Sequence, residues 1–138
     1  MEKANRIFAL AVGLMLLSGV AHANKADDDI RITGTYSDLY WNDEGGDLLG
    51  TEVRIVCGHD HYQGTIQIAE GGITDLGVFD VVLPDTGKIV FDVPLARYAG
   101  RFVGKIKQNR LVGTLTFKSR PGDPMELSLP KKRSYWDN

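Results

Sequence analysis

The feature that most restricts the fold is an apolar-x-Gly-x-apolar pattern, which occurs four times inside short runs of alternating apolar and polar residues. The four glycines are Gly34, Gly64, Gly104 and Gly113, and each lies on the apolar phase of its run. Glycine inside a strand costs stability, so its repetition there indicates sharply coiled strands with no room for an inward side chain. Such coiling is typical of a small closed β-barrel. A two-sheet β-sandwich with glycines at bends is the alternative.

Alternation of apolar and polar residues continues beyond these glycines, whereas residues 24–138 have no helical periodicity. Short segments rich in Gly, Asn, Asp and Pro separate the alternating runs, which favours neighbouring antiparallel strands. The sequence therefore predicts an all-β fold, a small closed antiparallel up-and-down barrel of about eight strands. The expected strands are residues 30–41, 51–57, 62–69, 76–83, 88–93, 101–107, 110–118 and 125–129.

The N-terminus has the pattern of a secretory signal peptide: Lys3 and Arg6 precede an apolar run at residues 7–17, and Ala21-His22-Ala23 forms a cleavage site. The apolar run is about half as long as a membrane-spanning helix, and no later run approaches that length. We therefore expect a signal peptide at residues 1–23, a single β-barrel domain at residues 24–138, and no membrane-spanning segment. The domain is expected to be exported to a bacterial periplasm or the extracellular medium.

Three segments resemble landmarks of a group of small exported bacterial proteins of uncharacterised function. They are Ile-Thr-Gly-Thr-Tyr at residues 32–36, Tyr-Gln-Gly-Thr-Ile-Gln-Ile-Ala-Glu-Gly at residues 62–71, and Lys-Arg-Ser-Tyr-Trp-Asp at residues 132–137. The resemblance spans nearly all of the chain after residue 23. It implies a lipocalin-like, or calycin-like, β-barrel, and it points to no particular activity and no catalytic or binding residues.

Cys57, His59 and His61 are the potential metal ligands that lie close together in the sequence. On one extended strand the outer two would be about 13 Å apart, too far to share an ion, and zinc would need further ligands from elsewhere. We therefore predict that residues 58–61 form a hairpin turn without a metal. Cys57 continues the apolar phase of Val53 and Ile55, which predicts a small buried side chain. A metal site and a reactive thiol are the alternatives.

The usual catalytic constellations are missing from the sequence, which has neither a Gly-x-Ser-x-Gly elbow nor a phosphate-binding glycine loop. Asp80 and Asp92, each within a Phe-Asp-Val triplet, could form a carboxylate pair. The alternation instead favours outward positions for both, with the flanking Phe and Val residues pointing inward. We therefore predict a protein that is not an enzyme and that needs no cofactor.

Charge is unevenly distributed, because residues 24–100 contain 5 basic and 14 acidic residues whereas residues 101–138 contain 9 basic and 3 acidic ones. The overall excess of acid argues against nucleic-acid binding. Lys105 and Lys107 lie on the polar phase of their strand, which predicts a basic outer face for acidic lipid headgroups or an acidic protein. Alternatively, the barrel neutralises itself at its seam, where Asp-Asp-Asp at residues 27–29 would lie beside Lys-Lys-Arg at residues 131–133.

Two functions remain compatible with these patterns. In the first, the barrel binds a small apolar, lipid-like ligand in its interior. The residues expected to line that interior are Ile55, Tyr62, Ile66, Phe91, Phe102, Ile106, Leu115 and Phe117. In the second, the interior is packed, and the protein docks on an envelope protein, for example as an inhibitor of an exported enzyme. Docking would then use the basic C-terminal face together with residues 39–41 and 135–136.

Overall fold

The computed structural model describes residues 31–84 and 87–137, and within these residues it contains nine β-strands and no helix. The predicted signal peptide at residues 1–23 and the acidic residues 27–29 lie outside this part. One sheet has the order β1-β3-β4-β5 with β2 beside β3, and the other has the order β6-β7-β8-β9. The strands are β1 (Gly34–Ser37), β2 (Tyr40–Asn42), β3 (Asp47–Cys57), β4 (Tyr62–Glu70), β5 (Gly77–Val81), β6 (Ile89–Val93), β7 (Gly100–Lys107), β8 (Arg110–Phe117) and β9 (Met125–Pro130).

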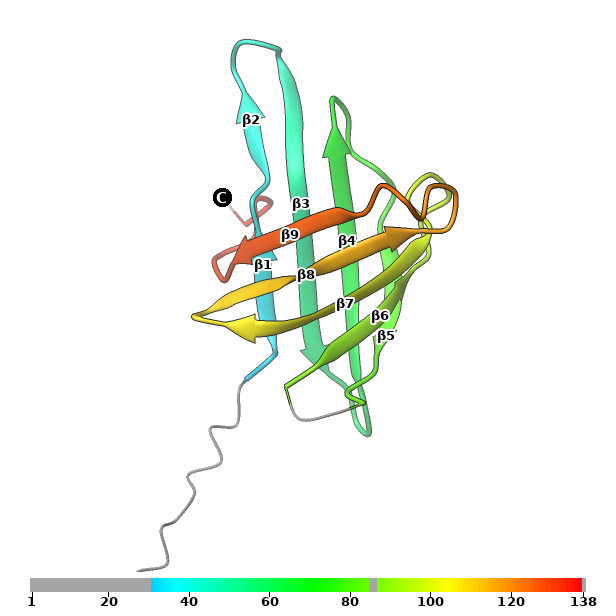
Figure 1. The fold of residues 1–138 in the computed structure, drawn as a ribbon. Coiled ribbons are helices and arrows are strands. Elements are labelled where there is room, and N and C mark those ends of the chain that lie inside the picture. Colours follow the sequence, from blue (N-terminus) through cyan, green and yellow to red (C-terminus); the bar gives the residue numbers. More distant parts are fainter. Residues whose placement is uncertain (1–30, 85–86, 138) are drawn as a thin grey trace, which may run out of the picture.

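The predicted all-β, antiparallel fold is confirmed, since all strand pairs in both sheets are antiparallel. In Figure 1, β7, β8 and β9 run across β3 and β4, so the two sheets form layers with the core between their inward faces. Neither sheet closes on itself within residues 31–84 and 87–137, so the predicted closed barrel is not shown and the two-sheet alternative fits. Isolated antiparallel bridges, Val82 with Val90 and Tyr36 with Lys131, connect the edges of the two sheets.

The run predicted as one strand over residues 30–41 is divided into β1 and β2. The division lies at Asp38, whose N–H donates to the Thr51 carbonyl at 3.0 Å. The Asp38 carboxylate in turn accepts the Thr51 N–H at 2.6 Å, so a side chain occupies a position that a backbone carbonyl would hold in a regular ladder. Gly50 faces this point with φ of +108°, and a Cβ there would meet the Asp38 carbonyl. The interruption therefore depends on a side-chain hydrogen bond that alternation does not reveal.

The turn between β7 and β8 has the expected chemistry for a two-residue hairpin. Gln108 and Asn109 both have positive φ, 49° and 57°, as a turn of type I′ requires. This turn fixes the register in which Gly104 lies opposite Gly113 and Phe102 opposite Leu115. The local sequence thereby positions two glycines side by side in the inner layer of the second sheet.

No helix capable of spanning a membrane occurs in the part of the chain that the structure describes.

Candidate functional site

The eight residues predicted to line the interior do come together in the structure. Six are buried within the main core: Ile55, Ile66, Phe91, Phe102, Leu115 and Phe117. Tyr62 and Ile106 are half-buried and pack against the same core. Sequence alternation therefore identified the inward phase of these strands correctly, because side chains of a strand alternate between its two faces.

Phenyl rings occupy the space that the glycines leave in the core. Phe79, Phe91 and Phe102 form a column in which successive ring centroids are 3.9 Å and 4.7 Å apart. A Cβ on Gly64 would overlap the Phe79 ring, and a Cβ on either Gly104 or Gly113 would overlap the Phe102 ring. Gly64 and Gly113 thus allow a ring of the neighbouring strand to lie against their backbone, as in aromatic rescue of glycine, and Gly104 lets the Phe102 ring lie along its own strand.

Gly34, the fourth glycine of the repeated pattern, has a different role. A Cβ at this position would overlap the Lys131 side chain, and its φ is +144°. The Lys131 ammonium donates to the Arg31 carbonyl at 3.3 Å. Gly34 therefore makes room for the chain that follows β9 and not for a core ring.

The stretch around the two histidines forms the predicted hairpin turn between β3 and β4, in which the Gly58 N–H donates to the His61 carbonyl at 2.8 Å. The predicted burial of Cys57 is wrong, because this residue is exposed at the last position of β3. The inward phase continues to the end of the strand, but the core does not extend that far. Within residues 31–84 and 87–137, no three His, Cys, Asp or Glu residues are grouped so that they could hold a metal ion.

His61 lies between two carboxylates at this hairpin. Its Nδ1 is 2.5 Å from Asp60 Oδ1, and its Nε2 is 3.3 Å from Asp80 Oδ1. The hydrogen bond to Asp60 is the main cause of a raised His61 pKa, and the charges of Asp60 and Asp80 act in the same direction. The same hydrogen bond lowers the pKa of Asp60. Sequence reasoning missed Asp80 as a partner because it comes from β5, and only strand pairing places it there.

Asp80 and Asp92 are both exposed, and the Phe and Val residues beside each are buried, as the alternation predicted. The two carboxylates have different partners. Asp80 accepts a hydrogen bond from the Gln63 amide at 3.2 Å, whereas Asp92 accepts two from the Arg101 guanidinium, at 2.8 Å and 3.3 Å. The Arg101 hydrogen bond is the main cause of a lowered Asp92 pKa. Each carboxylate is therefore bonded to its own partner on the outer face.

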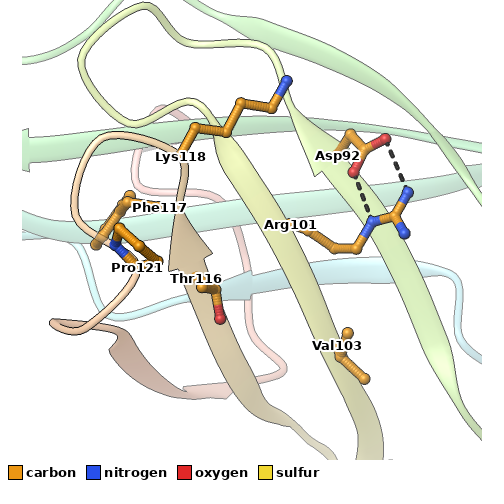
Figure 2. Close-up of a pocket in the computed structure, with 7 residues that line it drawn as sticks. All are labelled: Asp92, Arg101, Val103, Thr116, Phe117, Lys118 and Pro121. Atoms are coloured by element: carbon orange, nitrogen blue, oxygen red, sulfur yellow. Dashed lines mark hydrogen bonds and ion pairs between the residues drawn. The ribbon is translucent and has the colours of Figure 1, made fainter.

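A shallow depression of about 560 Å³ lies on the outer face of the second sheet. Figure 2 shows the Arg101 guanidinium turned toward Asp92, with Lys118 extending across the rim toward the same carboxylate. The polar rim thus combines two cations with one carboxylate. The remaining lining is Val103, Thr116, Phe117 and Pro121, which gives the depression an apolar side.

A basic outer face surrounds this depression. We define it as the exposed or half-exposed cations Lys88, Arg101, Lys105, Lys107, Arg110 and Lys118, which lie on or next to β6, β7 and β8. Each of the two acidic side chains on the strands of the same sheet accepts a hydrogen bond: Asp92 from Arg101, and Glu126 from the Thr114 hydroxyl at 2.8 Å. Sequence alternation identified Lys105 and Lys107. The other cations join them only through the register of neighbouring strands, such as Lys107 opposite Arg110.

Residues 131–137, here called the C-terminal tail, are held on the outer face of the first sheet. The buried Glu52 carboxylate accepts the Ser134 hydroxyl at 2.6 Å and the Tyr135 N–H at 2.9 Å. The Trp136 indole donates to the Gln67 side chain at 3.0 Å. Tyr135 packs on a small second cluster of Leu39, Leu48 and Ala69. Of the aromatic residues predicted for docking, Tyr40, Trp41 and Trp136 are about half exposed.

Comparison of the chain with protein-family models, with curated proteins and with solved structures found no match. The resemblance to small exported β-barrel proteins therefore rests on the three sequence landmarks. The last of these landmarks coincides with the C-terminal tail, whose serine and tryptophan bond to Glu52 and Gln67.

Proposed function

We propose that this protein is an exported, non-catalytic docking module with a packed interior, which binds an acidic protein surface through the basic outer face. The observation that carries the proposal is the stacked column of Phe79, Phe91 and Phe102. A small apolar ligand would need the volume that these rings occupy, since native cores are packed to the density of organic crystals. The binding surface then has to lie outside the core.

Electrostatics favours the basic outer face as that surface. Its six cations outnumber the two acids of the same sheet, and among these described residues only Arg101 is paired with one of the acids, Asp92, so the face keeps a net positive charge for an incoming acidic group. Like charges on one face increase the rate of association with a partner of opposite charge and exclude partners of the same charge. Lys105 and Lys107 are both exposed on β7, so a partner can reach them without any rearrangement.

The depression at Arg101 supplies the apolar contact that a charged face lacks. Val103 is 45% exposed and lines the depression on the side opposite Phe117 and Pro121 (Figure 2). A partner carboxylate near Lys118, followed by an apolar side chain over Val103, would match this arrangement. Interfaces gain most of their affinity from such desolvated anchors, and the surrounding charges set orientation.

We further infer that the two sheets belong to one flattened barrel. Support comes from the bridges at both sheet edges, where Val82 pairs with Val90 and Tyr36 with Lys131. The bridge between Tyr36 and Lys131 includes a hydrogen bond of 3.0 Å from the Lys132 N–H to the Thr35 carbonyl, so β1 lies beside the chain that follows β9. Export is inferred from the N-terminal sequence pattern, as is the bacterial envelope as the setting.

The experiment is a titration of the uniformly labelled protein with polyglutamate, followed by backbone amide chemical shifts at low salt. Shifts should concentrate on β7 and β8, and the double variant Lys105→Glu with Lys107→Glu should weaken binding at least about tenfold. Arg54→Glu is the matched control, because Arg54 is an exposed cation on β3 in the other sheet. Equal loss in the control would refute the assignment of the face.

Two further binding measurements distinguish a protein partner from a membrane surface and from a ligand in the interior. Binding to vesicles with anionic headgroups, without binding to polyglutamate, would identify a membrane surface and not a protein as the partner. Saturable binding of a fatty acid, with shifts at Ile55, Phe102 and Leu115, would overturn the packed module and establish an interior carrier.

A further inference from the structure

Both tryptophans of the chain, Trp41 and Trp136, lie on the surface, and each is about half exposed. Trp41 lies opposite Leu48 in the pairing of β2 with β3, and directly opposed side chains of an antiparallel pair share one face. Leu48 belongs to the small second cluster, against which Tyr135 of the C-terminal tail packs. Trp41 and the tail therefore lie on the same face, the outer face of the first sheet.

Three aromatic side chains follow one another on this face and are here called the aromatic stripe: Trp41, Tyr135 and Trp136. The Tyr135 and Trp136 rings meet edge to face, with centroids 5.0 Å apart. The Trp136 indole donates to the Gln67 side chain of β4 at 3.0 Å. Gln67 lies opposite Glu52, and Trp41 lies opposite Leu48 on the same strand. The stripe therefore extends over four positions of β3, from 48 to 52, which is about 13 Å.

Hydrogen bonds hold the tail part of the stripe in place. The Trp136 N–H donates to the Ser134 hydroxyl at 3.2 Å, and that hydroxyl donates in turn to the buried Glu52 carboxylate. The Tyr135 N–H donates to the other oxygen of the same carboxylate. A buried carboxylate destabilises the fold unless hydrogen bonds satisfy it, so Glu52 and the tail keep each other in position. Aromatic rings that are already fixed lose little conformational entropy when a ligand binds.

Polar groups beside the stripe are available to a ligand. Gln67 accepts the Trp136 indole with its carbonyl oxygen, and among the residues that the structure describes its NH₂ group has no partner. Arg54 is exposed on the same face and lies opposite Thr65, two positions before Gln67 on β4. Such diagonal neighbours are about 7–8 Å apart, within reach of long side chains. One ligand can therefore contact the rings, the Gln67 amide and the Arg54 guanidinium together.

The charge around the stripe is positive. Arg54, Lys132 and Arg133 are exposed, and in the part of the chain that the structure describes none of them has an ion pair. The exposed acid of the tail is Asp137, whereas the Glu52 carboxylate is buried and already accepts two hydrogen bonds. A surface with this balance attracts an anionic ligand.

We propose that the aromatic stripe binds an acidic glycan, a chain of linked sugar rings that carry carboxylates. The C–H groups on the face of a sugar ring are polarised by its oxygens, and they meet the negative faces of the two indole rings. The Gln67 amide donates to a sugar hydroxyl, and the Arg54 guanidinium binds a carboxylate with two parallel hydrogen bonds. Protein hot spots lie in pockets that exclude water, whereas the polar groups beside these rings remain hydrated.

The aromatic stripe and the basic outer face lie on different sheets, so the two proposals can be tested separately. Arg54→Glu should weaken binding of the acidic glycan at least about tenfold and leave binding of polyglutamate unchanged. Lys105→Glu with Lys107→Glu should have the reverse effect. If the lysine variant loses the glycan and Arg54→Glu keeps it, the stripe assignment fails. If polyglutamate does not bind and the glycan does, the glycan site stands and the basic outer face is refuted.

The probe is hexagalacturonate, titrated at physiological salt, where contacts between distant charges are screened. The indole N–H signals of Trp41 and Trp136 should shift along one saturation curve, and magnetisation transfer from the aromatic protons should reach the sugar C–H protons. The fully methyl-esterified hexamer keeps the rings without the charge, so it should bind at least about tenfold more weakly. Polyglutamate supplies carboxylates without sugar rings and should shift neither indole signal. No saturable binding of hexagalacturonate at millimolar concentration, or equal affinity for the ester, would overturn the proposal.

Variants test the ring contacts. Trp41→Ala should weaken glycan binding at least about tenfold. Tyr40→Ala is the matched control, because Tyr40 is equally exposed and adjacent in sequence but lies on the other face of β2, opposite Leu49. An equal loss in Tyr40→Ala would overturn the proposal. If Trp41→Ala does not fold, Arg54→Glu and the methyl ester decide the outcome. A doubled mass in solution without glycan, with both indole N–H groups protected from exchange, would also overturn it, since a second copy of the chain would then cover the stripe.

Discussion

Replacing Phe102 by alanine is the most direct test of a packed interior. Phe102 is fully buried, its ring centroid is 4.7 Å from that of Phe91, and it covers the backbone at Gly104 and Gly113. Substitution of a buried Phe by Ala costs about 3–5 kcal/mol, which combines the lost transfer free energy with the cavity that remains. We expect a value near the upper end, because the two glycines have no side chains that could relax into the void.

The free energy of unfolding should be measured by urea denaturation at constant pH, with the slope m checked for equality between variants. A loss of about 4–5 kcal/mol is a large part of the roughly 5–15 kcal/mol that stabilises a typical domain, so the midpoint should fall clearly. Val103→Ala is the matched control, because it changes the adjacent, outward-facing residue and should alter stability by at most about 0.5 kcal/mol. A loss below about 1 kcal/mol for Phe102→Ala would refute the reasoning, since the ring would then face open space.

Three further predictions concern the surface. Glu52→Ala should lower the free energy of unfolding by about 1–3 kcal/mol, because it removes the buried carboxylate that accepts two hydrogen bonds from the C-terminal tail. Limited proteolysis should then cleave the tail faster than in the unchanged protein. An equally protected tail would contradict this prediction. His61 has a raised pKa, so its stabilising contribution should be complete below the ordinary histidine pKa and be lost as pH rises through the raised value. Proton NMR titration of His61 should show the raised pKa, and Asp60→Asn should lower it; an unchanged titration would refute the role of Asp60. Replacing the three aspartates at residues 27–29 by lysine should lower the free energy of unfolding, and replacing the basic residues 131–133 by acids in the same chain should restore much of that loss. Each exposed pair should contribute about 0–1 kcal/mol, and less at high salt. Additive effects in that cycle would show that the two segments are not neighbours.

Local patterns in the sequence determined most of the secondary structure. Alternation placed strands within a few residues of their observed bounds, and it assigned Phe91 and Phe102 to the inward face and Asp92 to the outward face. The turn at residues 58–61 was also predictable, because a glycine and polar residues between two alternating runs favour a hairpin. These successes have one physical basis: the two faces of a strand differ in solvent exposure, and that difference is recorded in consecutive residues.

Tertiary structure decided how the strands meet, which alternation does not encode. The glycines indicated coiling and space, but only the placement of β5 beside β4 shows that the Phe79 ring fills the space beside Gly64. The exposure of Cys57 and the contact of Asp80 with His61 likewise depend on where the core ends and which strands become neighbours. The burial of Glu52 needed the C-terminal tail, 82 residues further along the chain. Alternation is a property of one strand, whereas core packing and ion pairs arise between strands, where register, twist and the ends of the sheets determine the contacts.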